Sequence, residues 1–371
     1  MIYRLLWFAV ILLAASCRTQ TDTLWPESSQ SSTDIQYRGL DLERIQLDSV
    51  YTSGDGYAGV YRDKDLYFYD KYFGYLFVFN SNGHLKFRTL GMGNGPKEIK
   101  IKEGITCAAS VSGDLCIAGS TLDFQVYDAL KDRTVYTMMA FNPDLKRSPE
   151  NFCNYSYPEE NIQSSFDGRY LYINLDSQHP EFNYFETTED YLKNTFHIAK
   201  IDIKSQNATV LCKGYPRLYI SEPYKYSSFN LVNFAPSGSG FYVNFEADST
   251  IYRCDEEFRA VEAFGRAGMN MDLDYLAARS YDDADKYVLN RQEKGSYGKI
   301  AVAGDYIFRS YTRGSVSSVD GLQIYLDGVL VGDVDVPKCF HVAGKIGDRF
   351  FSEIFSDPDS GQLSCFAFSL L

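Results

Sequence analysis

The chain has 371 residues, of which 45% are hydrophobic and 16% are aromatic. It carries 36 Lys and Arg residues against 49 Asp and Glu residues, so its formal net charge is −13. The Lys and Arg residues form no basic stripe in the sequence, which argues against a nucleic-acid binder. The excess of acidic residues favours a well-solvated surface.

The first residues predict a secretory signal peptide. Arg4 is followed by an unbroken apolar run, LLWFAVILLAA, at residues 5–15. A helix of that length measures about 16 Å, roughly half the thickness of the hydrocarbon core of a bilayer. The run is therefore too short to span a membrane and suits the apolar core of a signal peptide at residues 1–16.

The end of this segment resembles a bacterial lipobox. Small residues, Ala14-Ala15-Ser16, precede Cys17, although Ala14 stands where the pattern usually has Leu. The resemblance implies cleavage before Cys17 and a lipid on that cysteine, which would anchor the protein in the outer membrane or elsewhere in the cell envelope, on either face. The alternative is an ordinary secretory signal with an incidental cysteine.

A polar segment follows the cysteine. Residues 18–34 are rich in Ser and Thr and show no apolar periodicity. Such a composition is typical of a flexible linker. We predict a lipidated flexible tether at residues 17–34 and a folded domain at residues 35–371.

The predicted domain is a series of strand-rich units. Short runs rich in Tyr, Phe, Val and Ile alternate with clusters of Gly, Asp, Asn and Ser, which is the signature of strands and turns. Units of this kind recur along the chain at residues 58–91, 105–141, about 162–213, 231–265, 299–336 and 339–371. This recurrence predicts an all-β repeat fold with six blades.

The last unit has one strand too few, and a spare strand lies near the N-terminus. The segment LDLERIQLD, residues 40–48, belongs to none of the units. A propeller whose last blade stayed open would leave unpaired backbone groups at a sheet edge. We therefore predict a six-bladed β-propeller that is closed by this N-terminal strand.

Two insertions interrupt the repeats. Apolar residues at helical spacing between 272 and 291 predict an inserted helix, with Asp272 as its N-cap and Gly295 beyond its end. A second insertion, residues 179–196, extends the third unit. Insertions on one face of a repeat fold often form the binding face.

Several short motifs resemble those of known propellers. The segments SFDGRYLYI (residues 165–173) and APSGSGFYV (235–243) look like the SPDG-type hairpin of TolB-like repeats, with the Pro missing from the first and Ser237 in place of Asp in the second. The segment FVFNSNGHLKFRTLGMGNGPKEI (77–99) looks like the ending of an NHL-type repeat. With the lipobox, the chain is similar to the TolB-like six-bladed propeller lipoproteins of Bacteroidota. The resemblance implies an envelope scaffold without a defined activity.

The NHL-like ending contains a glycine-rich loop that is a candidate site. Successive glycines expose backbone N–H groups that can hold an anion, but no GK[ST] motif follows, so we favour a structural role. The residues of this loop motif are Gly91, Gly93, Gly95, Pro96 and Glu98.

Neither metal nor catalytic motifs stand out. The four histidines are isolated, no HExxH or GxSxG motif occurs, and the cysteine spacings match no zinc pattern. We therefore predict no metal, no cofactor and no catalytic residue. We predict that most of the cysteines are buried free thiols. A disulfide between Cys107 and Cys116 across a hairpin is the alternative.

A loop-like region of the third unit is rich in aromatic residues. Because Pro and acidic residues surround them, we expect partial exposure and a recognition surface for a protein or a glycan. The predicted binding residues are Tyr155, Tyr157, Phe182, Tyr184, Phe185 and Tyr191.

We predict a cell-envelope lipoprotein that acts as a non-catalytic propeller scaffold for a protein or glycan partner. The alternative is a propeller glycoside hydrolase or lyase that acts on an envelope or dietary glycan. Such an enzyme would need paired carboxylates at the mouth of the central channel, and a pair of this kind is not identifiable from one sequence.

Overall fold

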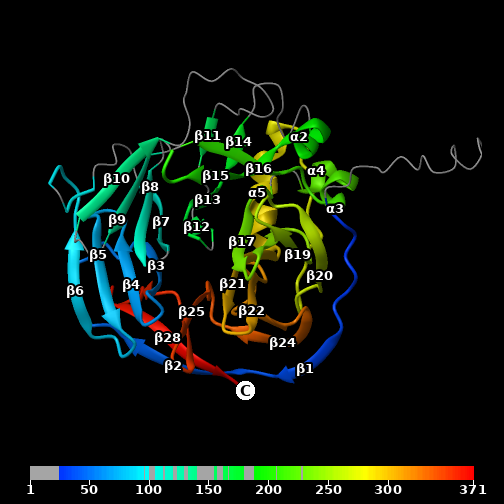
Figure 1. Ribbon diagram of the computed structural model, residues 1–371. Coiled ribbons are helices and arrows are strands. Elements are labelled where there is room, and N and C mark those ends of the chain that lie inside the picture. The colour runs from blue at the N-terminus through cyan, green and yellow to red at the C-terminus, as the bar shows by residue number, and fades with distance from the viewer. Residues whose placement is uncertain are drawn as a thin grey trace, which may run out of the picture.

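The protein is a closed six-bladed β-propeller. The computed structural model describes residues 25–95, 97–99, 105–111, 113–119, 123–128, 133–139, 154–156, 162–165, 167–178, 188–205, 207–226 and 229–371. Within them, six mainly antiparallel sheets form a ring (Figure 1). The innermost strand of each sheet contacts the innermost strands of both neighbouring sheets. The predicted fold class is therefore confirmed.

Each of the first three blades has four strands, which run from the channel outwards. Blade 1 contains β3 (Gly56–Tyr61), β4 (Asp65–Asp70), β5 (Tyr75–Asn80) and β6 (Leu85–Leu90). Blade 2 contains β7 (Ile105–Val111), β8 (Asp114–Gly119), β9 (Asp123–Asp128) and β10 (Arg133–Met139). Blade 3 contains β12 (Ile162–Ser164), β13 (Tyr170–Asn174), β15 (Phe196–Asp202) and β16 (Ala208–Lys213). A separate pair beside blade 3 is formed by β11 (Asn154–Ser156) and β14 (Asp176–Gln178).

Of the other three blades, blades 5 and 6 each include a strand from the N-terminal part of the chain. Blade 4 contains β17 (Val232–Ser237), β18 (Gly240–Phe245), β19 (Thr250–Asp255) and β20 (Ala260–Gly265). Blade 5 contains β21 (Ser296–Ala303), β22 (Tyr306–Thr312), β23 (Asp320–Leu326), β24 (Val329–Val336) and, outermost, β1 (Thr33–Tyr37). Blade 6 contains β25 (Val342–Ile346), β26 (Arg349–Ser352), β28 (Leu363–Leu370) and β2 (Leu40–Gln46), with the short β27 (Phe355–Ser356) paired to β28.

Middle strands are buried on both faces, and this explains their aromatic composition. In β4, DLYFYD, all six residues are buried, whereas four residues of the outer strand β6 are exposed. Alternate residues of β4 pack toward opposite neighbours: Tyr67 and Tyr69 toward blade 2, Leu66 and Phe68 toward blade 6. A strand between two sheets therefore needs apolar side chains on both faces.

The strand β2 closes the ring as predicted. It pairs antiparallel with β28 along its whole length, from Leu40 opposite Leu370 to Gln46 opposite Ser364. The N-terminal strand is thus the outermost strand of the last blade. It satisfies backbone groups of β28 that would otherwise form an open sheet edge.

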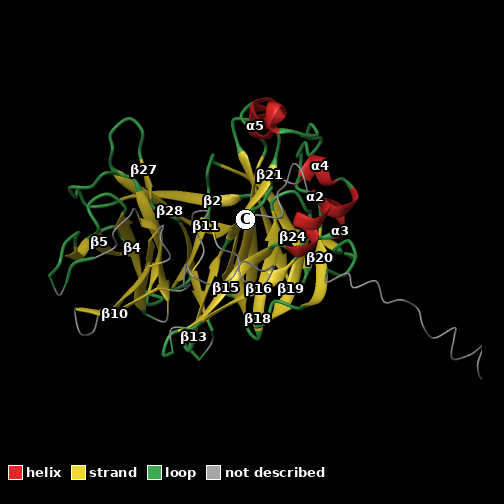
Figure 2. Ribbon diagram, turned by 90° about the horizontal axis from the view of Figure 1, so that it is seen from above, coloured by secondary structure: helices red, strands yellow, loops and turns green. Residues whose placement is uncertain are grey.

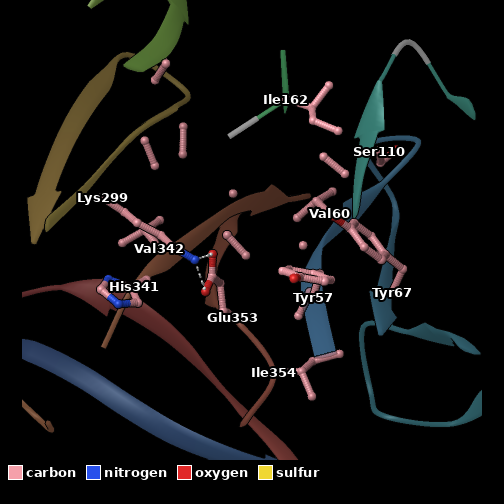
Figure 3. Close-up of a pocket in the computed structure, with 18 of the residues that line it drawn as sticks. Tyr57, Val60, Tyr67, Ser110, Ile162, Lys299, His341, Val342, Glu353 and Ile354 are labelled. Carbon is pink, nitrogen blue, oxygen red and sulfur yellow. Dashed lines mark hydrogen bonds and ion pairs between the residues drawn. The ribbon is translucent and has the colours of Figure 1, made fainter. Parts of the chain in front are cut away.

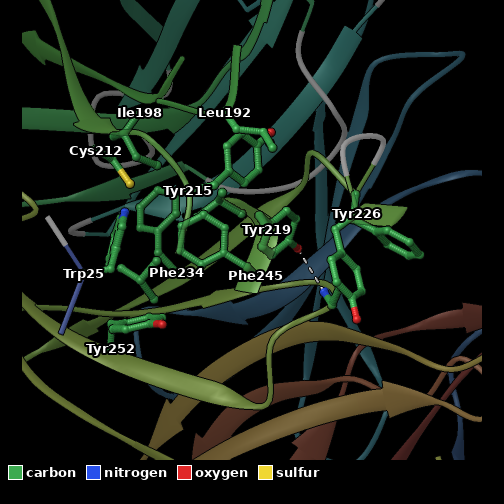
Figure 4. Close-up of a cluster of buried hydrophobic side chains, with 14 of the residues drawn as sticks. Trp25, Leu192, Ile198, Cys212, Tyr215, Tyr219, Tyr226, Phe234, Phe245 and Tyr252 are labelled. Atoms are coloured by element: carbon green, nitrogen blue, oxygen red, sulfur yellow. Dashed lines mark hydrogen bonds between the residues drawn. The ribbon is translucent and has the colours of Figure 1, made fainter. Parts of the chain in front are cut away.

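Trp25, which lies before the predicted start of the folded domain at residue 35, already belongs to the core. Trp25 is only 4% exposed, and its ring meets those of Phe245 and Tyr252 edge-on at 5.0 and 4.8 Å (Figure 4). Its indole Nε1 donates a hydrogen bond to Gly214 O at 3.0 Å. The side chain is therefore part of the hydrophobic core of blades 3 and 4.

Residues 25–37, which we call the N-terminal strap, stay attached to the propeller beyond this anchor. Ser31 and Gly265 exchange two hydrogen bonds, and β1 pairs parallel with β24. The prediction of a flexible tether is therefore wrong for residues 25–34. Their Ser-rich composition indicated solvation, but the backbone is held by hydrogen bonds that composition does not report. Residues 1–24, including the signal peptide and Cys17, lie outside the described residues.

The described helices lie on one face of the ring. They are α2 (Thr188–Asn194), α3 (Arg217–Ser221), α4 (Pro223–Tyr226), α5 (Ala284–Glu293) and the 3₁₀ turn η1 (Tyr281–Asp283). Each occupies a loop at the end of the blades where the innermost strands begin, which we call the insertion face. Figure 2 shows these helices and β27 toward one edge and the β13 and β18 hairpins toward the other.

The inserted helix is shorter than predicted. It begins at Ala284, whereas residues 272–280 are not helical. Asp272, the predicted N-cap, instead accepts hydrogen bonds from the backbone N of Asp274 at 3.0 Å and from Lys294 Nζ. Asp side chains that bond to the backbone two residues on favour turns over helix, and this overrides the apolar spacing.

The register of blade 2 does not place Cys107 and Cys116 opposite each other. Cys107 lies opposite Ala118, and Cys116 lies opposite Ala109. The direct facing across a hairpin that we considered for these two cysteines is therefore not observed.

We expect Trp25→Ala to destabilise the whole propeller, because it removes a buried indole and leaves a cavity between blades 3 and 4. Substitutions of this kind cost about 3–5 kcal/mol. The check is urea denaturation followed by far-UV circular dichroism. Val316→Ala is the matched control, since Val316 is 84% exposed. A Trp25→Ala unfolding curve like that of the wild type would show that the strap is not part of the folded unit.

Candidate functional site

The innermost strands of all six blades surround a cavity of about 640 Å³ on the propeller axis. Of its 29 lining residues, 12 are Gly, Ala or Ser, such as Ala58, Ala235, Ala301 and Ala343. Gly59 also makes room for the ring of Tyr67, because a Cβ at this position would lie 2.8 Å from that ring. Small residues on the converging strands therefore leave room for a ligand.

A polar cluster lies at the insertion-face end of this cavity (Figure 3). Lys299 from β21 of blade 5 reaches Glu353, which follows β26 of blade 6. The ammonium Nζ lies 2.9 Å from both carboxylate oxygens. Because the two residues come from different blades, their contact joins blades 5 and 6 at the mouth of the cavity.

The imidazole of His341 completes the cluster, and its hydrogen bonds define its tautomer. Ser310 Oγ donates to Lys299 O at 3.0 Å, so its single proton is already used. The same oxygen lies 2.9 Å from His341 Nδ1. Nδ1 must therefore be the donor, and Nε2 is left as the acceptor of the ring. Burial lowers the pKa of His341 to about 4, so the ring is neutral at pH 7.

The Ser310–His341 contact is not that of an activated nucleophile. Ser310 is 4% exposed, and its hydroxyl proton is directed to a backbone carbonyl. In a catalytic dyad the serine would instead donate to the imidazole and face the substrate. Ser310 therefore orients His341, which lines the cavity.

A second ion pair lies across the mouth, on blade 1. Lys71 Nζ is 3.8 Å from Asp55 Oδ2 and 6.0 Å from the centre of the Tyr57 ring. All three residues line the cavity. The mouth thus combines two ion pairs, one aromatic ring and one neutral imidazole. Together they offer donors and acceptors for hydroxyl, amide or other uncharged polar groups.

The predicted glycine-rich loop uses its own groups internally. Gly95 N donates to Glu98 Oε2 at 2.7 Å, and Gly93 N donates to Ile99 O at 3.1 Å. A Cβ at Gly93 would come within 2.1 Å of the Glu98 carboxylate. The absence of a side chain at Gly93 therefore leaves space for the Glu98 carboxylate, which accepts a hydrogen bond within the loop. This arrangement agrees with a structural role. Pro96 lies outside the described residues.

The predicted aromatic surface is only partly described. Tyr155 lies in β11, opposite Ser177. Tyr191 lies in α2 and is 2% exposed, packed near Tyr215 at a ring distance of 5.9 Å, so the expected exposure is wrong for this residue. It belongs to the hydrophobic core, near the end of the insertion at residues 179–196. Tyr157, Phe182, Tyr184 and Phe185 lie outside the described residues.

Sequence reasoning missed the residues at the cavity mouth. His341 was noted only as an isolated histidine, and Lys299 only as the start of a repeat unit. One signal was available, because Lys299, His341 and Asp55 all stand at or just before the innermost strand of a blade. In this propeller, the side chains at the start of the innermost strands line the cavity on the axis.

Two further properties concern only the described residues. No group of three His, Cys, Asp or Glu side chains among them is placed to hold a metal ion. Their helices also lack the length and apolarity that crossing a bilayer requires.

Comparisons with known proteins show the fold alone. No family model matches the sequence, and no curated protein matches it. A member of the DUF4221 family from Bacteroides vulgatus superposes with a TM-score of 0.60 at 11% identity, over 92% of this chain and 99% of that chain. A Bacteroides fragilis protein described as a candidate exported protein gives 0.52 at 14% identity, over 93% and 99%. Matches extend to 1025 chains, so the architecture alone does not indicate an activity.

We expect the stability of the protein to fall as the pH drops from 6.5 towards 4. The folded-state pKa of His341 is about 4, below the ordinary value of 6.5. Its contribution is fully present above pH 6.5 and is lost on acidification, because the unfolded chain takes up a proton that the folded chain refuses. Urea midpoints measured between these pH values check this. Burial also lowers the pKa of His197, to about 3, so this histidine adds to the same pH dependence. His341→Gln removes one of these two titrating groups and should reduce the slope without abolishing it, and an unchanged slope would contradict the contribution of His341.

Proposed function

We propose that the protein is a lipid-anchored propeller of the cell envelope that binds a protein or glycan partner at its cavity mouth without transforming it. The Lys299–Glu353 pair is the observation that carries this proposal. It places a donor and an acceptor side by side at the rim of a preformed cavity, and each is already neutralised by the other. Such a pair suits hydrogen bonding to a ligand at little cost in reorganisation.

The N-terminal part of the chain supports attachment to a membrane. Cys17 directly follows the signal-like segment at residues 1–16, and Trp25 is already buried in the folded core. If Cys17 carries a lipid, residues 18–24 alone separate the membrane from the propeller. Seven extended residues span about 25 Å at most. The propeller would therefore be held close to the membrane surface.

A glycoside hydrolase or lyase is less well supported. A hydrolase of this kind needs one carboxyl group as an acid and a second as base or nucleophile. The acidic residues of the mouth, Glu353 and Asp55, each form an ion pair with a lysine. That arrangement suits the holding of polar groups better than proton transfer to a glycosidic oxygen.

We expect Cys17→Ser to release the protein from the membrane, because it removes the acceptor of the lipid. Fractionation of expressing cells and incorporation of labelled palmitate measure this. Cys339→Ser is the matched control, since Cys339 is an exposed cysteine within the folded domain. Wild-type protein that takes up no palmitate and stays in the soluble fraction would refute the anchor.

We expect partner contacts to be specific to the insertion face. A photoactivatable amino acid at Asp55, at the mouth, should crosslink in cells to a defined protein or glycan. The same amino acid at Asp348, exposed in the β25–β26 turn on the opposite face, should not. Equal crosslinking from both positions, or none from either, would contradict binding at the mouth.

A further inference from the structure

A group of exposed aromatic rings stands on the insertion face of blade 1. Tyr51 and Tyr72 are 73% and 74% exposed. Both flank the partly buried Phe73, with ring centres 5.1 and 4.9 Å from it. Phe73 in turn stacks over Tyr75 at 6.0 Å, which connects the group to the aromatic core of the blade. We call Tyr51, Tyr72 and Phe73 the aromatic platform.

The platform is held in place by a fully buried carboxylate. Asp70 Oδ1 accepts hydrogen bonds from the backbone N of Tyr72 and Phe73 at 2.9 and 2.7 Å. Its Oδ2 accepts from Thr52 Oγ1 and Ser53 N at 2.5 and 2.6 Å. One side chain thus fixes both loops that carry the exposed rings. Such preorganisation reduces the entropy lost when a ligand orders a surface.

The platform is continuous with the mouth of the cavity. Lys71, next to Tyr72 in the chain, donates its backbone N–H to Asp55 O at 3.0 Å, and both residues line the cavity. On the other side, a Cβ at Gly54 would lie 2.9 Å from Ser356 Oγ of blade 6. Ser356 follows the cavity residues Glu353 and Ile354. The loops that carry the rings therefore adjoin residues that line the cavity.

The charges of this region balance, which indicates the class of ligand. Lys71 is paired with Asp55, and Lys299 with Glu353. An anionic or cationic ligand would have to compete with these internal partners. An uncharged ligand rich in hydroxyl groups would use both members of a pair as donor and acceptor. Its apolar ring faces would fit exposed tyrosine rings, whose hydroxyls remain in water.

From these contacts we infer that the partner is an uncharged oligosaccharide. Its sugar rings stack on Tyr51 and Tyr72, and its terminal unit enters the cavity, where Lys299, Glu353 and His341 Nε2 bind its hydroxyls. The inference rests on the proposed function and names the ligand class of the same site.

The test is isothermal titration calorimetry on the full chain in detergent. The probes are uncharged hexasaccharides of glucose, mannose, galactose and xylose, with hexagalacturonate as the charged comparison. We expect at least one uncharged sugar to bind, with an affinity that changes less than about twofold between roughly 50 and 500 mM salt, because screening weakens only charged partners. Tyr51→Ala and Tyr72→Ala should each weaken binding by about tenfold, and Tyr72→Phe should retain most of it.

Two controls separate binding from folding. Tyr224→Ala removes a tyrosine that is 38% exposed on α4, away from blade 1, and should bind as the wild type does. The double variant Lys299→Met with Glu353→Leu leaves no unpaired charge and should lose at least tenfold in affinity if the sugar reaches the cavity. Thermal melting confirms that each variant is folded.

The possible failures are distinguishable. Platform variants that bind like the wild type, or binding of hexagalacturonate alone, would overturn the inference. If no sugar binds but crosslinking at Asp55 identifies an envelope protein, the glycan assignment is wrong and the proposed function stands. If neither experiment finds a partner, both fail.

Discussion

The pairing of β2 with β28 is the constraint on which the cavity depends. It joins residues near opposite ends of the chain, such as Leu40 and Leu370, and makes blade 6 complete. Only a closed ring brings blade 5, blade 6 and blade 1 around one axis. Lys299, Glu353 and Tyr57 come from these three blades and share the lining of the cavity. Loss of closure would therefore remove the site together with the edge protection of the last sheet.

A buried guanidinium reinforces the junction of blades 4 and 5. Arg309 is fully buried in β22. It donates hydrogen bonds to the carbonyl oxygens of Ser249 and Arg266, from blade 4 and the loop that follows it, and to Gln323 Oε1 within its own blade. Its charge also lies 4.1 Å from the centre of the Tyr297 ring. A charge removed from water needs such complete hydrogen bonding, so this network favours one relative position of the two blades.

The two faces of the ring differ in what they can do. The face with the hairpin turns is built from tight reversals such as Asp167-Gly168, where Gly168 has a φ of +69°. The insertion face carries the helices, the polar cluster and the exposed rings of blade 1. Interaction chemistry is therefore concentrated where loops enter each blade, while the opposite face consists mainly of tight turns. This arrangement supports the insertion face as the one that meets a partner.

Much of the fold was predictable from the sequence, because strands and turns have local signatures. Alternating aromatic runs and turn dipeptides indicated six units, and the leftover strand at residues 40–48 indicated how the ring closes. The site was much less predictable. Of its residues, none stood out by type or spacing, since Lys299 and Glu353 are 54 positions apart and meet only across two blades. The aromatic prediction for the third unit was wrong at Tyr191, because aromatic composition does not tell a recognition surface from a buried helix face.

The sequence by itself thus determined the class of fold, the number of blades and the order in which they close, since each depends on patterns within a few residues. The tertiary structure alone decided where the folded domain begins, where the inserted helix starts and which side chains meet at the axis. Trp25 is the clearest case. It stands in a polar segment without periodicity, and only the groove between blades 3 and 4, built by residues about 190–230 positions later, makes it part of the core. Contacts of that range depend on the assembled shape, which no local pattern contains.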